Sequence, residues 1–170
     1  YLRRVRERLN LLETSLGSHE GIFISSGFTK IYSLLVDDFI MYDGRVGAAL
    51  GLLGRLYAEE IGLNRIPQAI EFSFGSGRGP DGQLQTVNRR NPSKGKYRLP
   101  EFSGNHNRHI NDNIKASWLL KRLADGTTSR FALLPQGPLL NERVTAIQSA
   151  LFMIGYDVRC DRKWKIIEKQ

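Results

Sequence analysis

The strongest helical pattern in the chain is the stretch Asp43-Gly-Arg-Val-Gly-Ala-Ala-Leu-Gly-Leu-Leu-Gly-Arg-Leu-Tyr57, which continues to about Ile61. One apolar line at helical spacing consists of Val46, Leu50, Leu53 and Tyr57. A second line at that spacing consists of Gly47, Gly51 and Gly54. A glycine inside a helix costs about 1 kcal/mol relative to alanine, so three in register predict that another helix packs very close along them. We therefore expect a central, buried helix with Asp43 as its N-terminal cap.

Apolar residues at helical spacing predict further helices on both sides of this one. We expect them over residues 1–16, 25–36, 107–124 and 139–154, and Gly17, Gly126 and Gly155 follow three of them, where helices commonly end. The alternation of Glu71-Phe-Ser-Phe74 predicts a short strand. The expected fold is therefore mainly α, a single helical domain over residues 1–170.

Residues 75–105 interrupt this helical pattern with a glycine-rich, basic segment. A loop of this length inside a domain is usually functional or disordered, and residues 84–102 can form a small hairpin within it. A phosphate track is predicted from its basic residues, which are Arg78, Arg89, Arg90, Lys94, Lys96 and Arg98. Tyr97 and Phe102 either stack on an unpaired base or fasten the segment to the core.

Composition excludes several classes of protein. With 41% hydrophobic and 9% aromatic residues among 170, the chain can build one core and is not wholly disordered. Its longest apolar runs are only a few residues long, too short for a transmembrane helix. The single cysteine, Cys160, excludes an internal disulfide and favours an intracellular, cytoplasmic protein, associated with the nucleoid in a bacterial cell. Because no initiator Met or signal peptide is present, we expect part of a longer chain.

The net charge of +8 is unevenly distributed. Residues 17–62 carry three basic and six acidic residues, whereas residues 75–122 carry ten basic and three acidic ones. A localised positive region is what a polyanion requires, because each neutralised phosphate releases counterions. Nucleic acid is the favoured partner, and a solvated basic face, an anionic membrane surface or an acidic protein are the alternatives.

Other chemistry has weaker support in the sequence. His106, His109 and Asp112 share one face of a predicted helix, as metal ligands or as a polar helix start. The glycines of residues 75–79 lack the Lys-Ser/Thr and the helix of a phosphate-binding loop. We therefore expect neither a metal nor another cofactor.

The most informative pair of residues is Lys30, in the first half of one predicted helix, and Asp43, at the entrance to the next. A partly desolvated lysine near its neutral form is a nucleophile for the C1′ atom of a sugar and forms a Schiff base with it. A carboxylate at a helix N-terminus stays ionised and can stabilise an oxocarbenium-like centre or assist proton transfer.

In this arrangement, residues 24–60 resemble the helix-hairpin-helix DNA glycosylases, particularly the 8-oxoguanine DNA glycosylase branch. In that family a hairpin leads into a helix with a lysine, and an aspartate lies just before the next helix in a Val-Asp-x-x-Val-like setting. The resemblance implies that Lys30 is the Schiff-base nucleophile and Asp43 the helix-capping catalytic carboxylate. It also implies double-stranded DNA as the partner and a damaged base as the leaving group. The family hairpin has two glycines close before its lysine, whereas residues 25–29 contain only Gly27.

Two other interpretations remain open on the sequence alone. In the first, Asp43 is an ordinary helix cap and Lys30 an exposed residue, and the protein is a non-catalytic nucleic-acid-binding module. In the second, the glycine-lined helix and the basic tail serve protein contacts in an interaction subunit.

Overall fold

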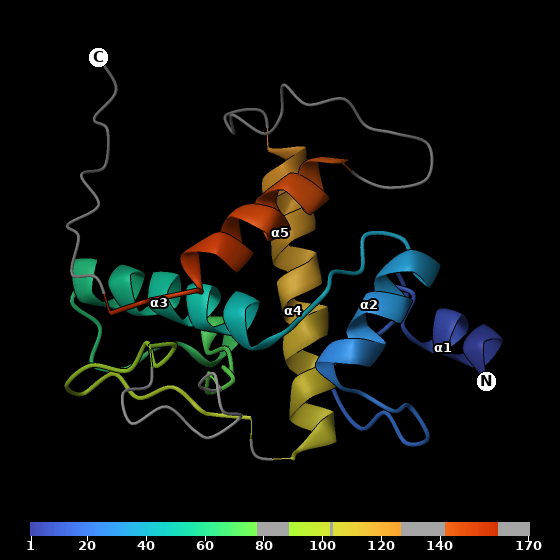
Figure 1. The fold of residues 1–170 in the computed structure, drawn as a ribbon, viewed down its shortest axis with the longest axis horizontal. Coiled ribbons are helices and arrows are strands. Elements are labelled where there is room, and N and C mark those ends of the chain that lie inside the picture. The colour runs from blue at the N-terminus through green and yellow to red at the C-terminus, as the bar shows by residue number, and fades with distance from the viewer. Residues whose placement is uncertain (78–88, 103, 127–141, 160–170) are drawn as a thin grey trace.

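The computed structural model describes residues 1–77, 89–102, 104–126 and 142–159. Within them the chain forms the helices α1 (Leu2–Arg8), α2 (Ser26–Leu35), α3 (Gly44–Glu60), α4 (His106–Asp125) and α5 (Glu142–Ile154), with a 3₁₀ turn at Gln68–Ile70 (Figure 1). Two isolated bridges, Phe74 with Glu101 and Lys94 with Tyr97, are the only β pairings in these residues. The expected mainly α fold is confirmed.

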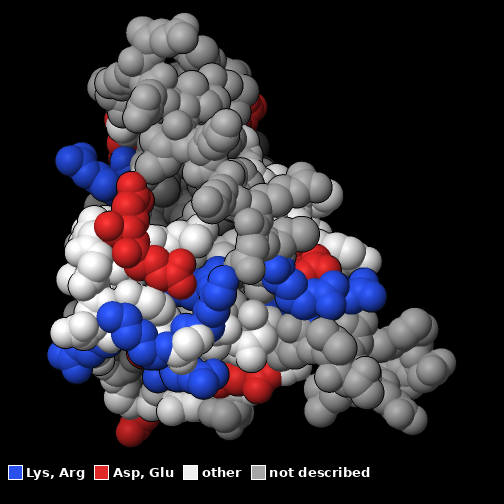
Figure 2. Space-filling view, turned by 90° about the vertical axis from the view of Figure 1, so that its left-hand side faces the viewer, with Lys and Arg blue, Asp and Glu red and all other residues white. Residues whose placement is uncertain are grey.

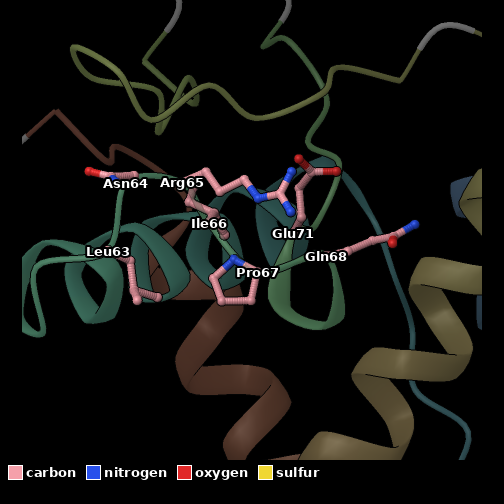
Figure 3. A pocket seen from close by; sticks show the side chains of 7 residues that line it. All are labelled: Leu63, Asn64, Arg65, Ile66, Pro67, Gln68 and Glu71. Atoms are coloured by element: carbon pink, nitrogen blue, oxygen red, sulfur yellow. The ribbon is translucent and has the colours of Figure 1, made fainter.

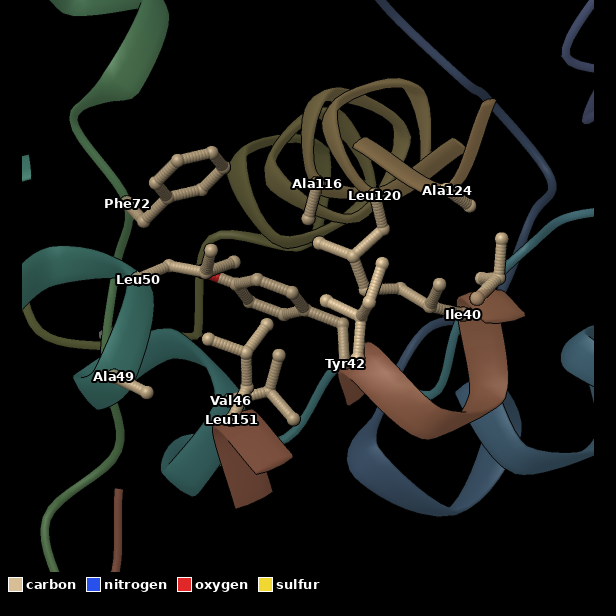
Figure 4. Close-up of a cluster of buried hydrophobic side chains, with 12 residues drawn as sticks. Ile40, Tyr42, Val46, Ala49, Leu50, Phe72, Ala116, Leu120, Ala124 and Leu151 are labelled. Atoms are coloured by element: carbon tan, nitrogen blue, oxygen red, sulfur yellow. The ribbon is translucent and has the colours of Figure 1, made fainter. Parts of the chain in front are cut away.

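Helix α4 stands at the centre and is shared by two apolar clusters (Figure 1). Its second half contributes Ala116, Leu120 and Ala124 to a cluster with α3 and α5, and Figure 4 shows the Tyr42 ring among these side chains. Its first half contributes Ile110 and Ile114 to a cluster with α1 and α2. Because one helix fills both clusters, α4 fixes the position of α2 relative to α3.

The glycine line of α3 meets extended chain rather than another helix. A Cβ atom on Gly47 would lie 2.1 Å from the Ser73 carbonyl oxygen, and one on Gly54 would lie 2.8 Å from the Ile70 carbonyl oxygen. A Cβ atom on Gly51 would lie 2.9 Å from a side-chain atom of Pro92. The predicted close approach is therefore confirmed, but the expected helical partner is wrong. Only a bare backbone face lets the segment 70–75 pack against α3 at this distance.

Buried polar groups hold the segment 71–74 in place. Asp112, 2% exposed, accepts hydrogen bonds from the backbone N–H and the hydroxyl of Ser73 and forms an ion pair with Lys115 at 2.8 Å. From the other side, the buried Tyr42 hydroxyl donates to the Ser73 carbonyl at 2.6 Å. Burial raises the pKa of Tyr42 well above its ordinary value, so its hydroxyl remains a donor. The predicted strand is thus an extended segment held by side chains and one bridge.

The first helix is shorter than the sequence indicates. It ends at Arg8, not at residue 16, and Leu12 is 86% exposed. The Asn10 side chain accepts a hydrogen bond from the Leu12 N–H, which competes with helix formation. The Leu11 carbonyl accepts from the Trp118 indole instead of from the next helical turn. The remaining helices agree with the prediction to within a few residues, and residues 139–141 lie outside the described chain.

No helix in the described residues has both the length and the apolar character needed to cross a membrane. Of the predicted hairpin over residues 84–102, the structure describes residues 89–102, in which Lys94 and Tyr97 bond to each other across a tight turn. This segment packs on α3 through Tyr97 and Leu99.

Replacement of Gly47 by alanine should destabilise the protein by about 3 kcal/mol or more, because the new Cβ atom would displace the Ser73 backbone. The matched control is Gly27→Ala in α2, where the nearest atom is the Ser25 hydroxyl at 3.5 Å. This variant should be as stable as the unmodified protein or gain up to about 1 kcal/mol. Urea unfolding monitored by circular dichroism measures both. A Gly47→Ala protein of unchanged stability would contradict the packing described for α3.

Candidate functional site

Asp43 caps α3, as its position in the sequence predicts. One carboxylate oxygen, Oδ1, accepts hydrogen bonds from the backbone N–H groups of Arg45 at 2.9 Å and Val46 at 3.0 Å. Both bonds end on the same oxygen, so the cap does not employ Oδ2. The carboxylate is half-buried and lies at the positive end of the helix dipole.

The carbonyl oxygen of Tyr42, directly before Asp43, is the point at which three helices meet. The Thr29 hydroxyl of α2 donates to it at 3.3 Å, and His109 Nε2 of α4 lies 3.1 Å from it. Thr29 precedes Lys30 as Tyr42 precedes Asp43, so this contact brings the two predicted catalytic residues onto neighbouring elements. Thr29 is buried and Lys30 is exposed, with Lys30 following it on the outer side of α2.

The His109 ring packs against two aromatic rings. Its ring stacks on Phe102 at 4.5 Å between centroids and lies 5.7 Å from the Tyr42 ring. Burial lowers the pKa of His109, and the bond to the Tyr42 carbonyl opposes this shift only in part. A carbonyl accepts only, so Nε2 carries the proton and Nδ1 is the unprotonated nitrogen of the neutral ring.

The alternative of a metal site at His106, His109 and Asp112 finds no support in the structure. Asp112 is occupied by Ser73 and Lys115. In the part of the chain that the structure describes, no three His, Cys, Asp or Glu side chains converge as metal ligands.

Arg45, in the first turn of α3, is held between two aromatic rings. Its guanidinium carbon lies 4.4 Å from the Phe152 ring centre and 5.2 Å from the Tyr156 ring centre. These contacts bring the end of α5 to the start of α3, and a Cβ atom on Gly155 would lie 1.8 Å from the Arg45 carbonyl oxygen. Aromatic faces attract a guanidinium, so these contacts hold the Arg45 side chain in position at the start of α3.

The basic segment begins at this same site. The pKa of Arg90 is lowered, first by partial burial and then by the nearby positive charge of Arg45, while Asp43 has the opposite influence. The Arg89 carbonyl accepts a hydrogen bond from the Val158 N–H at 2.9 Å, which fastens this stretch to the chain after α5. Arg45, Arg90 and Asp43 therefore share one end of α3.

From Arg90 the segment runs along α3. Pro92 packs on Gly51, and the Tyr97 hydroxyl donates to the Leu63 carbonyl at 2.7 Å, beyond the other end of the helix. The distance covered is about 25 Å, the length of α3. Lys94, Lys96 and Arg98 are exposed along this run. Figure 2 shows lysine and arginine side chains gathered over the lower part of the face where α3 ends.

Three residues of the predicted nucleic-acid contacts need comment. Tyr97 is only 7% exposed, so in this structure its ring offers no open face to a base. Its ring fastens the segment to the core, the alternative considered from the sequence. Phe102 is half-buried and stacks on His109. Arg78 lies outside the described residues.

Two cavities lie away from Asp43. One, of about 560 Å³, is lined by residues after the C-terminal end of α3, where Arg65 extends toward Glu71 (Figure 3). The other, of about 530 Å³, is a groove between α3, α4 and α5 whose walls are apolar apart from the Tyr57 hydroxyl. Neither cavity contains Lys30, Asp43 or His109, so neither belongs to the candidate site.

Sequence reasoning did not assign a role in this site to several residues, which are Thr29, Tyr42, Arg45, Phe152 and Tyr156. Only Phe152 and Tyr156 could have been found from the sequence. They are four residues apart, a spacing that places both side chains on one side of a helix end. The Thr29 contact with Tyr42 depends on tertiary packing and has no sequence signature.

Comparisons with protein-family models, with curated proteins and with solved structures gave no match to this chain. The function is therefore argued from the site itself.

The buried imidazole of His109 predicts a pH-dependent stability. Its pKa is lowered in the folded protein, whereas an unfolded histidine titrates near 6.5. Below about pH 6.5 the unfolded state thus binds a proton that folded His109 does not, so the free energy of unfolding should fall between pH 7 and pH 5. His19, whose pKa burial also lowers, acts in the same direction.

Urea unfolding at both pH values should show a smaller decrease for His109→Gln than for the unmodified protein. The control is His106→Gln, which removes an exposed imidazole from the same helix end. It should retain most of the decrease, because burial is a larger cause of the lowered His109 pKa than the charge of His106. An equal decrease in His109→Gln and the unmodified protein would contradict the role given to burial.

Proposed function

We propose that the protein is a DNA-binding domain that excises a base as a glycosylase, with Lys30 as nucleophile and Asp43 as the catalytic carboxylate. The observation that carries the proposal is the hydrogen bond from the Thr29 hydroxyl to the Tyr42 carbonyl, which fixes the elements bearing Lys30 and Asp43 against each other. Lys30 is exposed and Asp43 is half-buried, so a bound substrate can reach each of them.

In this proposal the Lys30 amine attacks the sugar C1′ atom. The bond from C1′ to the base breaks, and the base departs with the bonding electrons and takes up a proton. The lysine nitrogen loses a proton, the C1′–O4′ bond opens as O4′ is protonated, and a protonated Schiff base between Lys30 and C1′ results. An exposed lysine reacts in this way only when bound DNA excludes water from it, so the reaction depends on a tight DNA contact around α2.

Asp43 is suited to the charge that develops at C1′ as the base leaves. Its Oδ1 atom is fixed by two backbone donors, and Oδ2 is left for the substrate. A carboxylate held this way stabilises an oxocarbenium-like centre without having to reorient. The His109 contact with the Tyr42 carbonyl supports the peptide that leads into Asp43.

The positive charges on the same side of α3 supply the electrostatic attraction for a phosphate backbone. Arg45 and Arg90 flank Asp43, and the exposed basic residues after them continue along α3. Such contacts position the duplex without reading its sequence. The proposal thus joins a reactive pair to an adjoining anion-binding surface.

The first test is borohydride trapping on duplex DNA that contains 8-oxoguanine. The reagent reduces the Schiff base, so the unmodified protein should give a covalent protein–DNA band. Lys30→Arg keeps the positive charge but has no nucleophilic amine at neutral pH, and it should bind the duplex without forming the band. Full trapping by Lys30→Arg would exclude Lys30 as the nucleophile.

Asp43→Asn separates the charge of this residue from its capping role. Asparagine caps a helix about as well as aspartate, so the melting temperature should remain close to that of the unmodified protein. The rate of trapping should fall by about 100-fold or more, because the carboxylate charge is lost at C1′. If Asp43→Asn is trapped at the rate of the unmodified protein, Asp43 serves only as a helix cap.

A non-catalytic nucleic-acid-binding module is the second candidate. It is favoured by the exposure of Lys30, whose side chain lies on the outer face of α2, and by the ordinary capping geometry of Asp43. This candidate requires the same basic surface, but it would give no covalent band in the borohydride-trapping experiment.

Both candidates predict that Arg89 and Arg90 contact phosphates. In Arg89→Ala/Arg90→Ala, duplex affinity should fall similarly for all sequences, and the dependence of log affinity on log salt should become shallower by about 1 to 2. The control is Arg122→Ala, at the last turn of α4, which should bind as the unmodified protein does. Fluorescence anisotropy over a series of salt concentrations measures both quantities. An unchanged salt slope in the double variant would remove this segment from the interface.

A further inference from the structure

A row of aromatic rings runs from Tyr1, directly before α1, to Tyr32 of α2. Successive ring centroids lie 5.7 Å apart from Tyr1 to Phe23, 6.3 Å from Phe23 to Phe28 and 5.9 Å from Phe28 to Tyr32. The Phe23 and Phe28 rings are inclined by only 30°. Tyr32 is fully buried, so the row rises from the core to the surface.

The backbone of Phe23 is fixed by a closed set of hydrogen bonds. Its N–H donates to the Tyr1 hydroxyl at 2.8 Å, and its carbonyl accepts from the Tyr32 hydroxyl at 2.5 Å. The Tyr1 hydroxyl lies 2.7 Å from that of Tyr32 and can donate to it, since the Tyr32 proton is already used. A ring that is 63% exposed is therefore held out on a rigid support.

The exposed face of α2 continues this surface. Phe28 is 37% exposed, and Ile31 and Leu34 are exposed beside it. By helical spacing, Phe28 and Lys30 lie at the two edges of this face, and Ile31 and Leu34 lie between them. The aromatic row thus adjoins the face that carries Lys30.

Positive charge accompanies the rings. Helix α1 presents four exposed arginines and one glutamate, and the arginines are Arg3, Arg4, Arg6 and Arg8. The Arg4 guanidinium carbon lies 5.9 Å from the Tyr1 ring centre, and a Cβ atom on Gly21 would lie 3.9 Å from one of its nitrogens. The Arg4 guanidinium therefore lies at the Tyr1 end of the row, where Phe23 is the next ring.

We propose that the exposed rings of Phe23 and Phe28, together with the arginines of α1, bind single-stranded nucleic acid. Each ring offers a face on which one unpaired base stacks, and the arginines attract the phosphates between such bases. The inference goes beyond the proposed excision, since the binding itself requires neither Lys30 nor Asp43. On a damaged duplex the same surface would hold a strand that has been opened near α2.

Charge complementarity distinguishes this occupant from a second copy of the chain. An isologous dimer through this surface would bring the arginines of one α1 toward those of the other, and the like charges would repel. A polyanion, in contrast, is attracted by the same arginines.

The test is anisotropy of a fluorescein-labelled oligothymidine of about 16 nucleotides, within the range of known single-strand sites. The unmodified protein should bind it, and Phe23→Ala/Phe28→Ala should bind at least about tenfold more weakly. Phe23→Leu/Phe28→Leu keeps apolar area but removes the aromatic faces, and it should also bind more weakly. The control is Met153→Ala, which removes an apolar side chain that is 71% exposed on α5, outside this surface, and should leave affinity unchanged.

Wild-type affinity in the double alanine variant, with its circular dichroism melting curve unchanged, would overturn the inference. So would an equal loss in Met153→Ala, or a dimer in light scattering that the double variant converts to a monomer. Trapping on duplex DNA reports on the proposed excision separately. If trapping fails while oligothymidine binding depends on the two phenylalanines, the excision is wrong and the single-strand surface stands.

Discussion

The close packing of the extended segment 70–75 on the bare glycine face of α3 is the constraint on which the rest of the structure depends. Gly47 and Gly54 admit backbone carbonyls where any side chain would block them. Asp112 of α4 then binds Ser73 from the opposite side, so one short segment ties α3 to α4. Removal of either contact would leave buried donors and acceptors unpaired, which costs about 1–3 kcal/mol for each group.

Tyr42 transmits this constraint to the candidate site. Its hydroxyl bonds to the Ser73 carbonyl, and its own carbonyl contacts Thr29 of α2 and His109 of α4. Tyr42 is thus held both by its side-chain hydroxyl and by its backbone carbonyl, and this fixes the peptide bond that leads into Asp43. A carboxylate positioned in this way is preorganised, because its surroundings need not move when a charge develops beside it.

Two surfaces of different character lie on either side of this junction. Along α3, cations are spread over about 25 Å with the aromatic side chain of Tyr97 buried, which suits the regular phosphates of a duplex. Around α1 and α2, phenylalanine rings are exposed beside arginines, which suits unpaired bases. The face that carries Lys30 adjoins the second surface, so a protein that opens a duplex at α2 would use both.

The sequence by itself determined the helices over residues 26–35, 44–60 and 106–125, because apolar spacing, cap residues and glycine stops are local signals. It also determined that Asp43 caps α3 and that something packs against the glycine line. Only the tertiary structure decided that this partner is extended chain, that Tyr97 is buried, and that α1 ends at Arg8 because Asn10 and Trp118 take over the next backbone groups. These outcomes depend on contacts between residues 16 to 107 positions apart in the chain or on a side-chain bond that competes with the helix. Neither is encoded in local periodicity.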